Sequence, residues 1–440
     1  MKNSRRPALF AVVLSVFFLL SAGTGFGTDE PASPLLRFLR QIPGAQITVQ
    51  PPTLFYREAY QIRLLQPLDH HQTKKDSFYQ KIYLSHLDFN RPTVIVTAGY
   101  QVNRNNISEP AKLLRANQIL VEHRFCGDSR PDSLNWQYLT AEQAAADLHR
   151  VVQLFRRVYS HGWLSTGRSK GGQTAAIFRF FYPQDVDATV AYVAPFNRSQ
   201  EDPRIDAFIR NRGGKECQKR IARFQLALLN RRLEIFPWYL RYLNRIKPPY
   251  LRNDETYEYA ILEYPFTFWQ WKKLPCDSIP LPDVPAEKLF HHLVKVIPFN
   301  GYFSRQEVIA TQPAYYQFFT ELGYYGFAYN DSTVLQNLRA TRNPTYRVFA
   351  PPNVSLTFHP ELMSRVIPWL QEHGDRMIYI YGGQDPWGAT AIELTGKANA
   401  YKFVKQEGNH RTRIEDLSQE EQHRILELLR QWLNLPPEVH

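Results

Sequence analysis

The chain has 440 residues, of which 44% are hydrophobic and 21% are charged, and this composition is ordinary for a globular protein with a large core. Its formal net charge is +12, yet the basic residues are scattered and do not alternate with aromatic residues along a stripe. A groove that binds nucleic acid requires such a stripe. The composition therefore favours one or two globular domains with a solvated basic surface and argues against a nucleic-acid partner.

Residues 1–27 differ from the rest of the chain. Lys2, Arg5 and Arg6 precede an apolar run over residues 8–20, and small residues follow it. This pattern is typical of a secretory signal peptide, whereas a membrane span needs about 18 or more apolar residues. We expect residues 1–27 to direct export of the mature chain and no later segment to span a membrane; an uncleaved anchor is the alternative.

The chain has three cysteines, so at most one intrachain disulfide can form. Cys217 and Cys276 lie in the same middle segment and are the better pair, while Cys126 follows a predicted strand and is expected to be a buried free thiol. No His-Glu-x-x-His motif or Cys/His spacing indicates a metal site, and no cofactor is expected.

The first third of the mature chain is rich in predicted strands. β-branched and aromatic runs separated by polar turns occupy residues 46–50, 60–66, 78–87, 93–99 and 117–123. Thr140 and Gln143 then form a predicted capping box that opens a long helix. The apolar residues of this helix recur at helical spacing, so one of its faces should pack on a sheet.

The next segment repeats the alternation of strand and helix. A short strand is predicted at residues 163–166, a helix from about residue 170 to Pro183, and a strand at residues 187–195. Strands that alternate with helices in this way are typical of a parallel α/β sheet with right-handed crossovers.

A long segment with few convincing strands interrupts this pattern. Residues 199–374 are helical or rich in aromatic residues, and strands return at residues 376–383 and 400–408 before a last helix that begins after Ser418. We interpret residues 28–198 and 375–440 as the two parts of one α/β domain, and residues 199–374 as a mainly helical cap inserted before the last strands.

The turn between the strand at residues 163–166 and its helix carries a G-x-S-x-G motif, from Gly167 to Gly171, with Ser169 at its centre. Glycines allow the tight strand-to-helix turn that lifts a serine above a sheet edge. A nucleophilic serine needs a base, and the elbow predicts an acid and then a histidine further along the chain. Asp385 and His410 each follow one of the last two predicted strands, in that order.

We therefore predict an α/β-hydrolase fold with Ser169, Asp385 and His410 as its catalytic residues. The backbone N–H of Lys170 and that of Tyr100, which follows the strand at residues 93–99, are the predicted oxyanion donors. For three of these positions, the local sequence also has a purely structural interpretation. Asp385 starts a turn, His410 lies in a loop, and the residue before Tyr100 is a strand-end glycine.

Five motifs occur in a specific order along the chain: EHRFCGDSRP at residues 122–131, YLTAEQAAAD at 138–147, STGRSKGG at 165–172, AYVAP at 191–195 and FTFWQW at 266–271. Together they resemble the secreted serine peptidases of the prolyl tripeptidyl and tetrapeptidyl aminopeptidase family. This family is a bacterial relative of the prolyl carboxypeptidase and dipeptidyl-peptidase group. Cys126 stands where an aromatic residue is more usual, and Arg168 occupies a variable place.

The resemblance implies an exported peptidase, periplasmic or extracellular, that releases short peptides from free N-termini and cleaves after proline. Such an enzyme needs a carboxylate for the substrate's ammonium group, and Glu122 and Glu263 are the candidates. Glu122 has the alternative of pairing with Arg124 or Arg130. Trp269, Trp271 and Trp387 are candidates for a proline pocket, although buried packing explains the first two as well.

Two other functions remain open from the sequence. An exported esterase or lipase would use the same three residues, and an apolar acyl tunnel would distinguish it from a peptidase whose pocket ends in carboxylates. A binding protein on the same scaffold would leave Ser169 and His410 too far apart to react.

Overall fold

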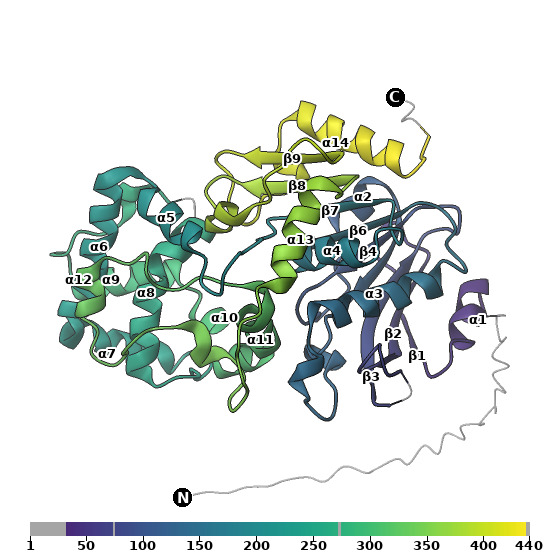
Figure 1. The fold of residues 1–440 in the computed structure, drawn as a ribbon. Coiled ribbons are helices and arrows are strands. Elements are labelled where there is room, and N and C mark those ends of the chain that lie inside the picture. Colours follow the sequence, from purple (N-terminus) through teal and green to yellow (C-terminus); the bar gives the residue numbers. More distant parts are fainter. Residues whose placement is uncertain (1–31, 74, 272–273, 437–440) are drawn as a thin grey trace, which may run out of the picture.

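The computed structural model describes residues 32–73, 75–271 and 274–436, and the predicted signal peptide lies outside these ranges. Within them, nine strands form one mixed sheet, and a large group of helices lies beside it (Figure 1). The strands are β1 (Gln46–Gln50), β2 (Glu58–Pro67), β3 (Ser77–His86), β4 (Thr93–Thr97), β5 (Asn117–Val121), β6 (Trp163–Arg168), β7 (Ala188–Tyr192), β8 (Met377–Gly382) and β9 (Ala400–Lys405).

The strand order across the sheet is β1-β2-β3-β5-β4-β6-β7-β8-β9. The pairs from β1 to β5 are antiparallel, whereas β5, β4, β6, β7, β8 and β9 run parallel to one another. Parallel strands present their carboxyl ends at one edge of the sheet, which is where α/β proteins place ligands. The loops after β4, β6, β8 and β9 therefore meet at this edge.

Helices cover both faces of the sheet. On one face lie α1 (Pro34–Arg40), α3 (Ala141–Phe155), α4 (Lys170–Phe181) and α13 (Glu361–Glu372), and on the other lie α2 (Glu109–Leu113) and α14 (Gln419–Trp432). Side chains alternate along β4, so Val94 packs under α2 while Ile95 faces α3. This arrangement is the α/β-hydrolase fold that the sequence predicts.

The start of α3 differs from the predicted capping box. The Thr140 hydroxyl accepts the N–H of Gln143 at 3.1 Å, which is half of the box. The Gln143 side chain instead bonds Asp69 and the N–H of His70, both at 2.9 Å. Tertiary partners therefore compete successfully for a side chain that would otherwise close the local motif. At α14, by contrast, Ser418 and Glu421 form the complete box.

The helices that come between β7 and β8 in the sequence enclose a second hydrophobic core, and they are teal and green in Figure 1. Its helices are α5 (Pro203–Asn211), α6 (Gly214–Asn230), α7 (Arg232–Leu243), α8 (Asn253–Trp271), α9 (Ala286–Val296), α10 (Phe299–Phe303), α11 (Arg305–Gln317) and α12 (Ser332–Gln336). We call these helices the helical region. Cys217 of α6 and Cys276, the better candidates for a pair from the sequence, form a disulfide, and Cys126 is the buried free thiol that the sequence predicts.

The predicted cap ends at residue 374, but its last helix packs on the sheet. Met363, Val366 and Leu370 of α13 share a hydrophobic core with Ile177 of α4 and Tyr379 of β8. The apolar face of α13 is thus buried against the α/β domain, and the helical region ends before it.

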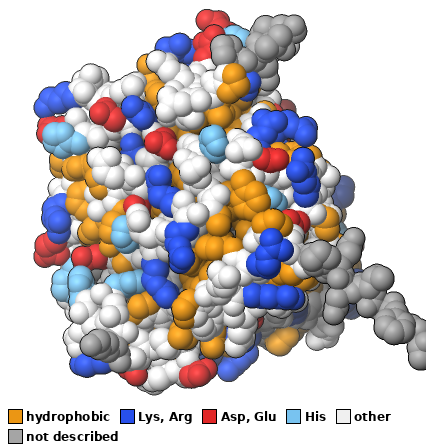
Figure 2. Space-filling view, turned by 90° about the vertical axis from the view of Figure 1, so that its right-hand side faces the viewer, with side chains coloured by type: hydrophobic (Ala, Val, Ile, Leu, Met, Phe, Trp, Pro, Cys, Tyr) orange, Lys and Arg blue, Asp and Glu red, His pale blue; other side chains and the backbone are white. Residues whose placement is uncertain are grey.

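On the face drawn in Figure 2, Lys and Arg side chains are separated by uncharged and hydrophobic ones. None of the helices in residues 32–73, 75–271 and 274–436 combines the length and apolarity that crossing a membrane requires.

Removal of the disulfide should destabilise the helical region. The bond closes a loop between cysteines 59 positions apart, and chain entropy gives such a loop about 4 kcal/mol of stabilisation. We expect the Cys217→Ala/Cys276→Ala variant to unfold at a lower temperature than the wild type in thermal scans. Reductant should lower the Tm of the wild type and leave that of the variant unchanged. Cys126→Ala is the control, since its Tm should remain sensitive to reductant.

Candidate active site

Ser169 occupies a strained turn between β6 and α4. Its backbone has φ +55° and ψ −126°, a conformation that residues with a side chain rarely adopt. Two hydrogen bonds hold the turn, because the Ser169 N–H donates to Tyr192 O at 2.8 Å and the N–H of Gln173 donates to Ser169 O at 3.0 Å. The strain therefore persists at the residue whose side chain lines the cavity at the sheet edge.

The glycines of the motif permit a close approach of backbone to backbone. A Cβ on Gly171 would lie 2.4 Å from the carbonyl oxygen of Thr97, and one on Gly167 would lie 2.3 Å from that of Gly171. No side chain fits at either position. The start of α4 is thus pressed against the end of β4, which brings the loops after β4 and β6 together.

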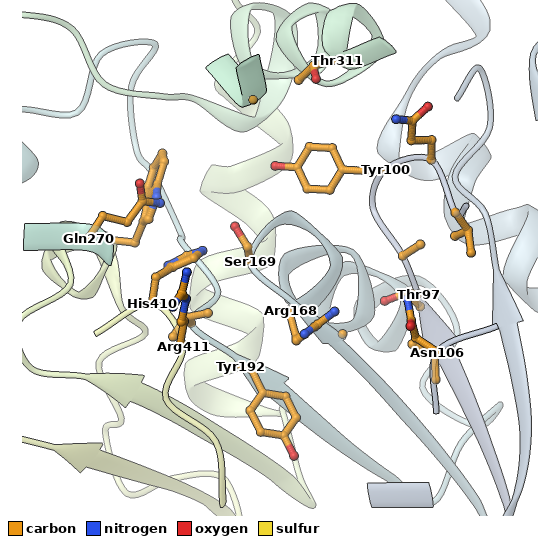
Figure 3. A pocket seen from close by; sticks show the side chains of 18 of the residues that line it. Thr97, Tyr100, Asn106, Arg168, Ser169, Tyr192, Gln270, Thr311, His410 and Arg411 are labelled. Carbon is orange, nitrogen blue, oxygen red and sulfur yellow. The ribbon is translucent and has the colours of Figure 1, made fainter. Parts of the chain in front are cut away.

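Asp385 and His410 meet at the same edge. Asp385 follows β8 and is fully buried, and its Oδ2 lies 2.6 Å from Nδ1 of His410, which follows β9. The Oδ1 atom of Asp385 accepts the N–H of Trp387 at 3.2 Å, so both carboxylate oxygens are held. With Nδ1 facing Asp385, the other ring nitrogen of His410 is available on the side of Ser169, and Figure 3 shows the two side chains next to each other.

The last turn of α8 supports His410, a contact that the sequence analysis missed. The N–H of His410 donates to the carbonyl of Gln270 at 3.1 Å, and the Trp271 ring lies edge-on to the imidazole with centroids 5.1 Å apart. The FTFWQW motif contains both residues, but no local pattern relates them to a histidine so distant in the sequence. The helical region is therefore part of the site itself.

Tyr100 contributes its side chain as well as its position. Figure 3 shows its hydroxyl directed toward Ser169. Burial raises the pKa of Tyr100, and a hydrogen bond with the Ser169 side chain partly offsets that rise. The sequence analysis considered only the backbone N–H of this residue. A neutral phenol so close to the nucleophile is suited to donate a hydrogen bond to an oxyanion.

The Lys170 side chain points away from the cavity into the interior. It is 1% exposed, and its Nζ donates to the carbonyl of Gly99 at 3.0 Å and lies 3.2 Å from Nε2 of His123. Burial lowers the pKa of Lys170 to about 8. The ammonium therefore ties the start of α4 to the residue before Tyr100, and the Lys170 N–H remains at the helix N-terminus beside Ser169.

A cavity of about 1420 Å³ contains Ser169, Tyr100 and His410 and extends into the helical region. Glu263 of α8 lies in its wall and is 2% exposed. The carboxylate accepts hydrogen bonds from Thr267 and Tyr325, both at 3.0 Å, and from the Tyr346 hydroxyl. Burial raises the pKa of Glu263 to about 8. No basic side chain of the described chain pairs with it.

Aromatic residues surround Glu263. The cavity wall includes Tyr302, Tyr315, Tyr324, Tyr325, Tyr346, Phe349 and Trp387. Of the predicted tryptophans, Trp387 and Trp271 line this cavity. The Trp387 ring packs against Phe266 and Tyr325 with centroids 5.4 and 5.2 Å apart. The site thus combines one unpaired carboxylate with a predominantly aromatic wall.

Trp269 does not line the cavity, contrary to the expectation that it binds substrate. Glu263 and Gln270 are seven residues apart, so they lie on one face of α8, and Trp269 falls on another face. Its ring packs in the core of the helical region and lies 5.9 Å from the Arg212 guanidinium.

Glu122 is also absent from the cavity lining. One of its oxygens accepts the N–H of Val102 at 2.7 Å and lies 3.0 Å from Lys81 Nζ, and the other accepts the N–H and hydroxyl of Ser129 at 2.8 and 2.7 Å. A carboxylate with four internal partners has no capacity left for a ligand. The pairing with Arg124 is wrong too, because that guanidinium binds Asp147.

The described part of the chain contains no group of three or more His, Cys, Asp or Glu side chains arranged as metal ligands. The chemistry at hand is that of a serine, an imidazole and a buried carboxylate. The imidazole can accept the serine proton while the carboxylate stabilises the resulting charge, which is the chemistry of acyl transfer.

The fold is that of an α/β hydrolase, with Ser169 at the turn between β6 and α4 and the Asp385–His410 pair at the same edge of the sheet. The model of the PS-10 peptidase S37 family matches residues 31–439, and the chain belongs to this family of serine peptidases. The prolyl tri/tetrapeptidyl aminopeptidase of Streptomyces mobaraensis is 32% identical over 449 residues, which cover 99% of this chain and 93% of that protein.

Two further comparisons give weaker matches. The lysosomal Pro-X carboxypeptidase of Bos taurus is 26% identical over 246 residues, which cover 50% of this chain and 48% of that protein. The structure of a proline iminopeptidase from Mycobacterium smegmatis aligns with a TM-score of 0.40 and 11% identity, covering 84% of this chain and 98% of that one.

Tyr100→Phe should lower kcat by about 10²-fold with little change in KM, because removal of one oxyanion donor costs about this much. The measurement is steady-state hydrolysis of a chromogenic peptide anilide. Tyr79→Phe, in β3 and outside the cavity, is the matched control and should behave as the wild type. An unchanged kcat in Tyr100→Phe would show that the phenol has no part in the reaction.

Proposed function

We propose that this chain is an exported serine exopeptidase that releases tripeptides and tetrapeptides from free N-termini and prefers proline before the cleaved bond. The observation that carries the proposal is Glu263, a buried carboxylate with no cationic partner in the wall of the cavity that holds Ser169 and His410. The relative from Streptomyces mobaraensis, named a prolyl tri/tetrapeptidyl aminopeptidase, supports it.

In the proposed reaction, His410 takes the proton of Ser169 as the serine oxygen attacks the scissile carbonyl. Asp385 holds Nδ1 of the imidazole at 2.6 Å and stabilises the imidazolium. The N–H groups of Lys170 and Tyr100 and the Tyr100 hydroxyl stabilise the oxyanion. His410 then gives its proton to the leaving amine, and water releases the peptide from the acyl-enzyme.

Glu263 is suited to bind the ammonium group of a free N-terminus. A carboxylate held by tyrosine hydroxyls and surrounded by aromatic rings offers both an ion pair and cation–π contacts to an ammonium ion. A buried acid of this kind gains most when a cation arrives, because the bound charge replaces the lost solvation.

The length of α8 supports a limit on the released peptide. Gln270, which contacts His410, and Glu263 lie seven residues apart on one face of the helix, which corresponds to about 10 Å. Three residues of an extended peptide span about the same distance. An N-terminus at Glu263 therefore places the third or fourth peptide bond near Ser169.

The walls favour proline over a lipid chain. Trp387, Tyr324 and Tyr325 form an aromatic cluster in the wall near the carboxylate, and flat rings suit the pyrrolidine ring of proline. From the sequence, we expected a pocket that ends in a carboxylate to distinguish a peptidase from an esterase. Glu263 is such a carboxylate. Export agrees with the disulfide between Cys217 and Cys276, since disulfides persist in oxidising compartments.

Hydrolysis of Ala-Ala-Pro-p-nitroanilide tests the proposal directly. The peptide with a free amine should be cleaved at least about 10²-fold more efficiently than its N-acetylated form, because the blocked peptide leaves Glu263 without its cation. Ser169→Ala should abolish both activities. Equal cleavage of free and blocked peptides would rule out the aminopeptidase, and activity in Ser169→Ala would rule out the nucleophile.

The pH dependence should identify Glu263 as the ammonium ligand. Because the pKa of Glu263 is raised to about 8, its charged fraction increases as the pH rises from 6 to 8. The ratio of kcat/KM for wild type to that for Glu263→Gln should therefore rise over this interval. It should fall again as the substrate amine, with a pKa of about 8, loses its proton. The ratio cancels any pH dependence that the two enzymes share, and a flat ratio would contradict the assignment.

A further inference from the structure

A second charged surface lines the same cavity. Its basic side chains come from three separate parts of the chain, and we call them the cationic rim: Arg104, Lys112, Arg168, Arg411 and Arg413. Among the described residues, no member of the rim forms an ion pair with a carboxylate. This differs from the fold's other conspicuous cations, such as Arg124, which is paired with Asp147.

The three carboxylates near the rim, those of Glu109, Glu415 and Asp416, form no ion pair with it in the described residues. Glu109 accepts the Tyr192 hydroxyl at 2.7 Å and the N–H groups of Ile414 and Glu415 at 3.0 and 2.9 Å. Its oxygens are thus committed to holding the loop that follows His410. Glu415 is exposed at the cavity mouth. The Asp416 carboxylate accepts the N–H of Arg413 at 2.8 Å. Five cations against three carboxylates still leave this part of the cavity with a net positive charge.

Two members of the rim are held together in spite of their like charges. The Arg413 guanidinium lies over the Tyr192 ring, 5.5 Å from its centroid, and Arg168 pairs in register with Tyr192 across β6 and β7. Burial and then the charge of Arg168 lower the pKa of Arg413, opposed by Tyr192, Glu109 and Asp416. Two positive side chains that remain close together in a cavity repel each other. Such an arrangement is typical of a site that an anionic ligand completes.

The rim lies on the leaving-group side of the proposed reaction. Arg168 directly precedes Ser169, and Arg411 directly follows His410, the group that must protonate the leaving amine. In Figure 3, Thr311 of the helical region lies on one side of Ser169, and Arg168 and Tyr192 lie on the other. A peptide with its N-terminus at Glu263 therefore extends past Ser169 toward the rim.

We infer that the cationic rim binds a peptide carboxylate just beyond the cleaved bond, so that the enzyme prefers substrates with an acidic residue in the first two positions after proline. The inference rests on the proposed function, since it requires the N-terminus at Glu263. The carboxylate comes from an acidic side chain or, in a short peptide, from the C-terminus of the chain. Both sources share the same chemistry.

The test compares peptides Ala-Ala-Pro-X-Ala-amide in which X is Asp, Asn or Lys. At low salt, Asp should give a kcat/KM about tenfold above Asn, with Lys lowest, and the differences should shrink at high ionic strength. A free-acid version of the Asn peptide, compared with its amide, measures the contribution of the terminal carboxylate. Ala-Ala-Pro-p-nitroanilide, which has no residue after proline, reports on the proposed function alone.

Arg168→Gln and Arg411→Gln, singly and together, should each reduce the Asp-to-Asn ratio toward one. Arg91→Gln, an exposed arginine outside the cavity, is the matched control and should keep the wild-type ratio. Equal cleavage of Asp and Asn peptides, or a preference that survives in the double variant, would overturn the inference. Failure to cleave the anilide and every peptide would overturn the proposed function as well. The anilide therefore distinguishes failure of the inference from failure of the proposed function.

Discussion

The contact between the start of α4 and the end of β4 is the constraint on which the site depends. Gly171 brings its backbone against the Thr97 carbonyl, where a Cβ would lie at 2.4 Å, and the buried Lys170 ammonium binds the Gly99 carbonyl. These two contacts fix the loops after β4 and β6 relative to each other. Ser169 and Tyr100 can face each other only because no side chain separates their backbones.

The helical region, which lies beside the sheet, forms part of the candidate site through α8. The Gln270 carbonyl and the Trp271 ring position His410, while Glu263 lies two turns earlier on the same face. A single rigid helix therefore connects the catalytic edge to the proposed ammonium site. The distance between them is set by helix geometry, and the proposed limit on the length of the released peptide follows from this distance.

Charged groups in this protein fall into two kinds. Glu122 with Lys81, and Arg124 with Asp147, are buried ion pairs with additional hydrogen bonds, and each stabilises a loop of the fold. Among the described residues, Glu263 and the members of the cationic rim lie in the cavity without forming an ion pair with a side chain of opposite charge. Burial of an unpaired charge is costly, so charges left in this state mark the places where a ligand provides the compensation.

Local patterns in the sequence were sufficient to predict the order of strands and helices, the turn around Ser169 and the contact between Asp385 and His410. Periodicity, glycine spacing and the order of motifs along the chain predict these features because each reflects a short-range constraint. The sequence identified Cys217 and Cys276 only as the better candidates for a disulfide, and the structure shows that they form it. Tertiary structure alone decided which polar residues face the cavity. The sequence alone does not distinguish Glu122 from Glu263. In the structure, the Glu122 carboxylate binds the Lys81 ammonium and the Ser129 hydroxyl, whereas the Glu263 carboxylate accepts hydrogen bonds from tyrosine and threonine hydroxyls. The difference arises from packing between distant segments, and no local pattern encodes it.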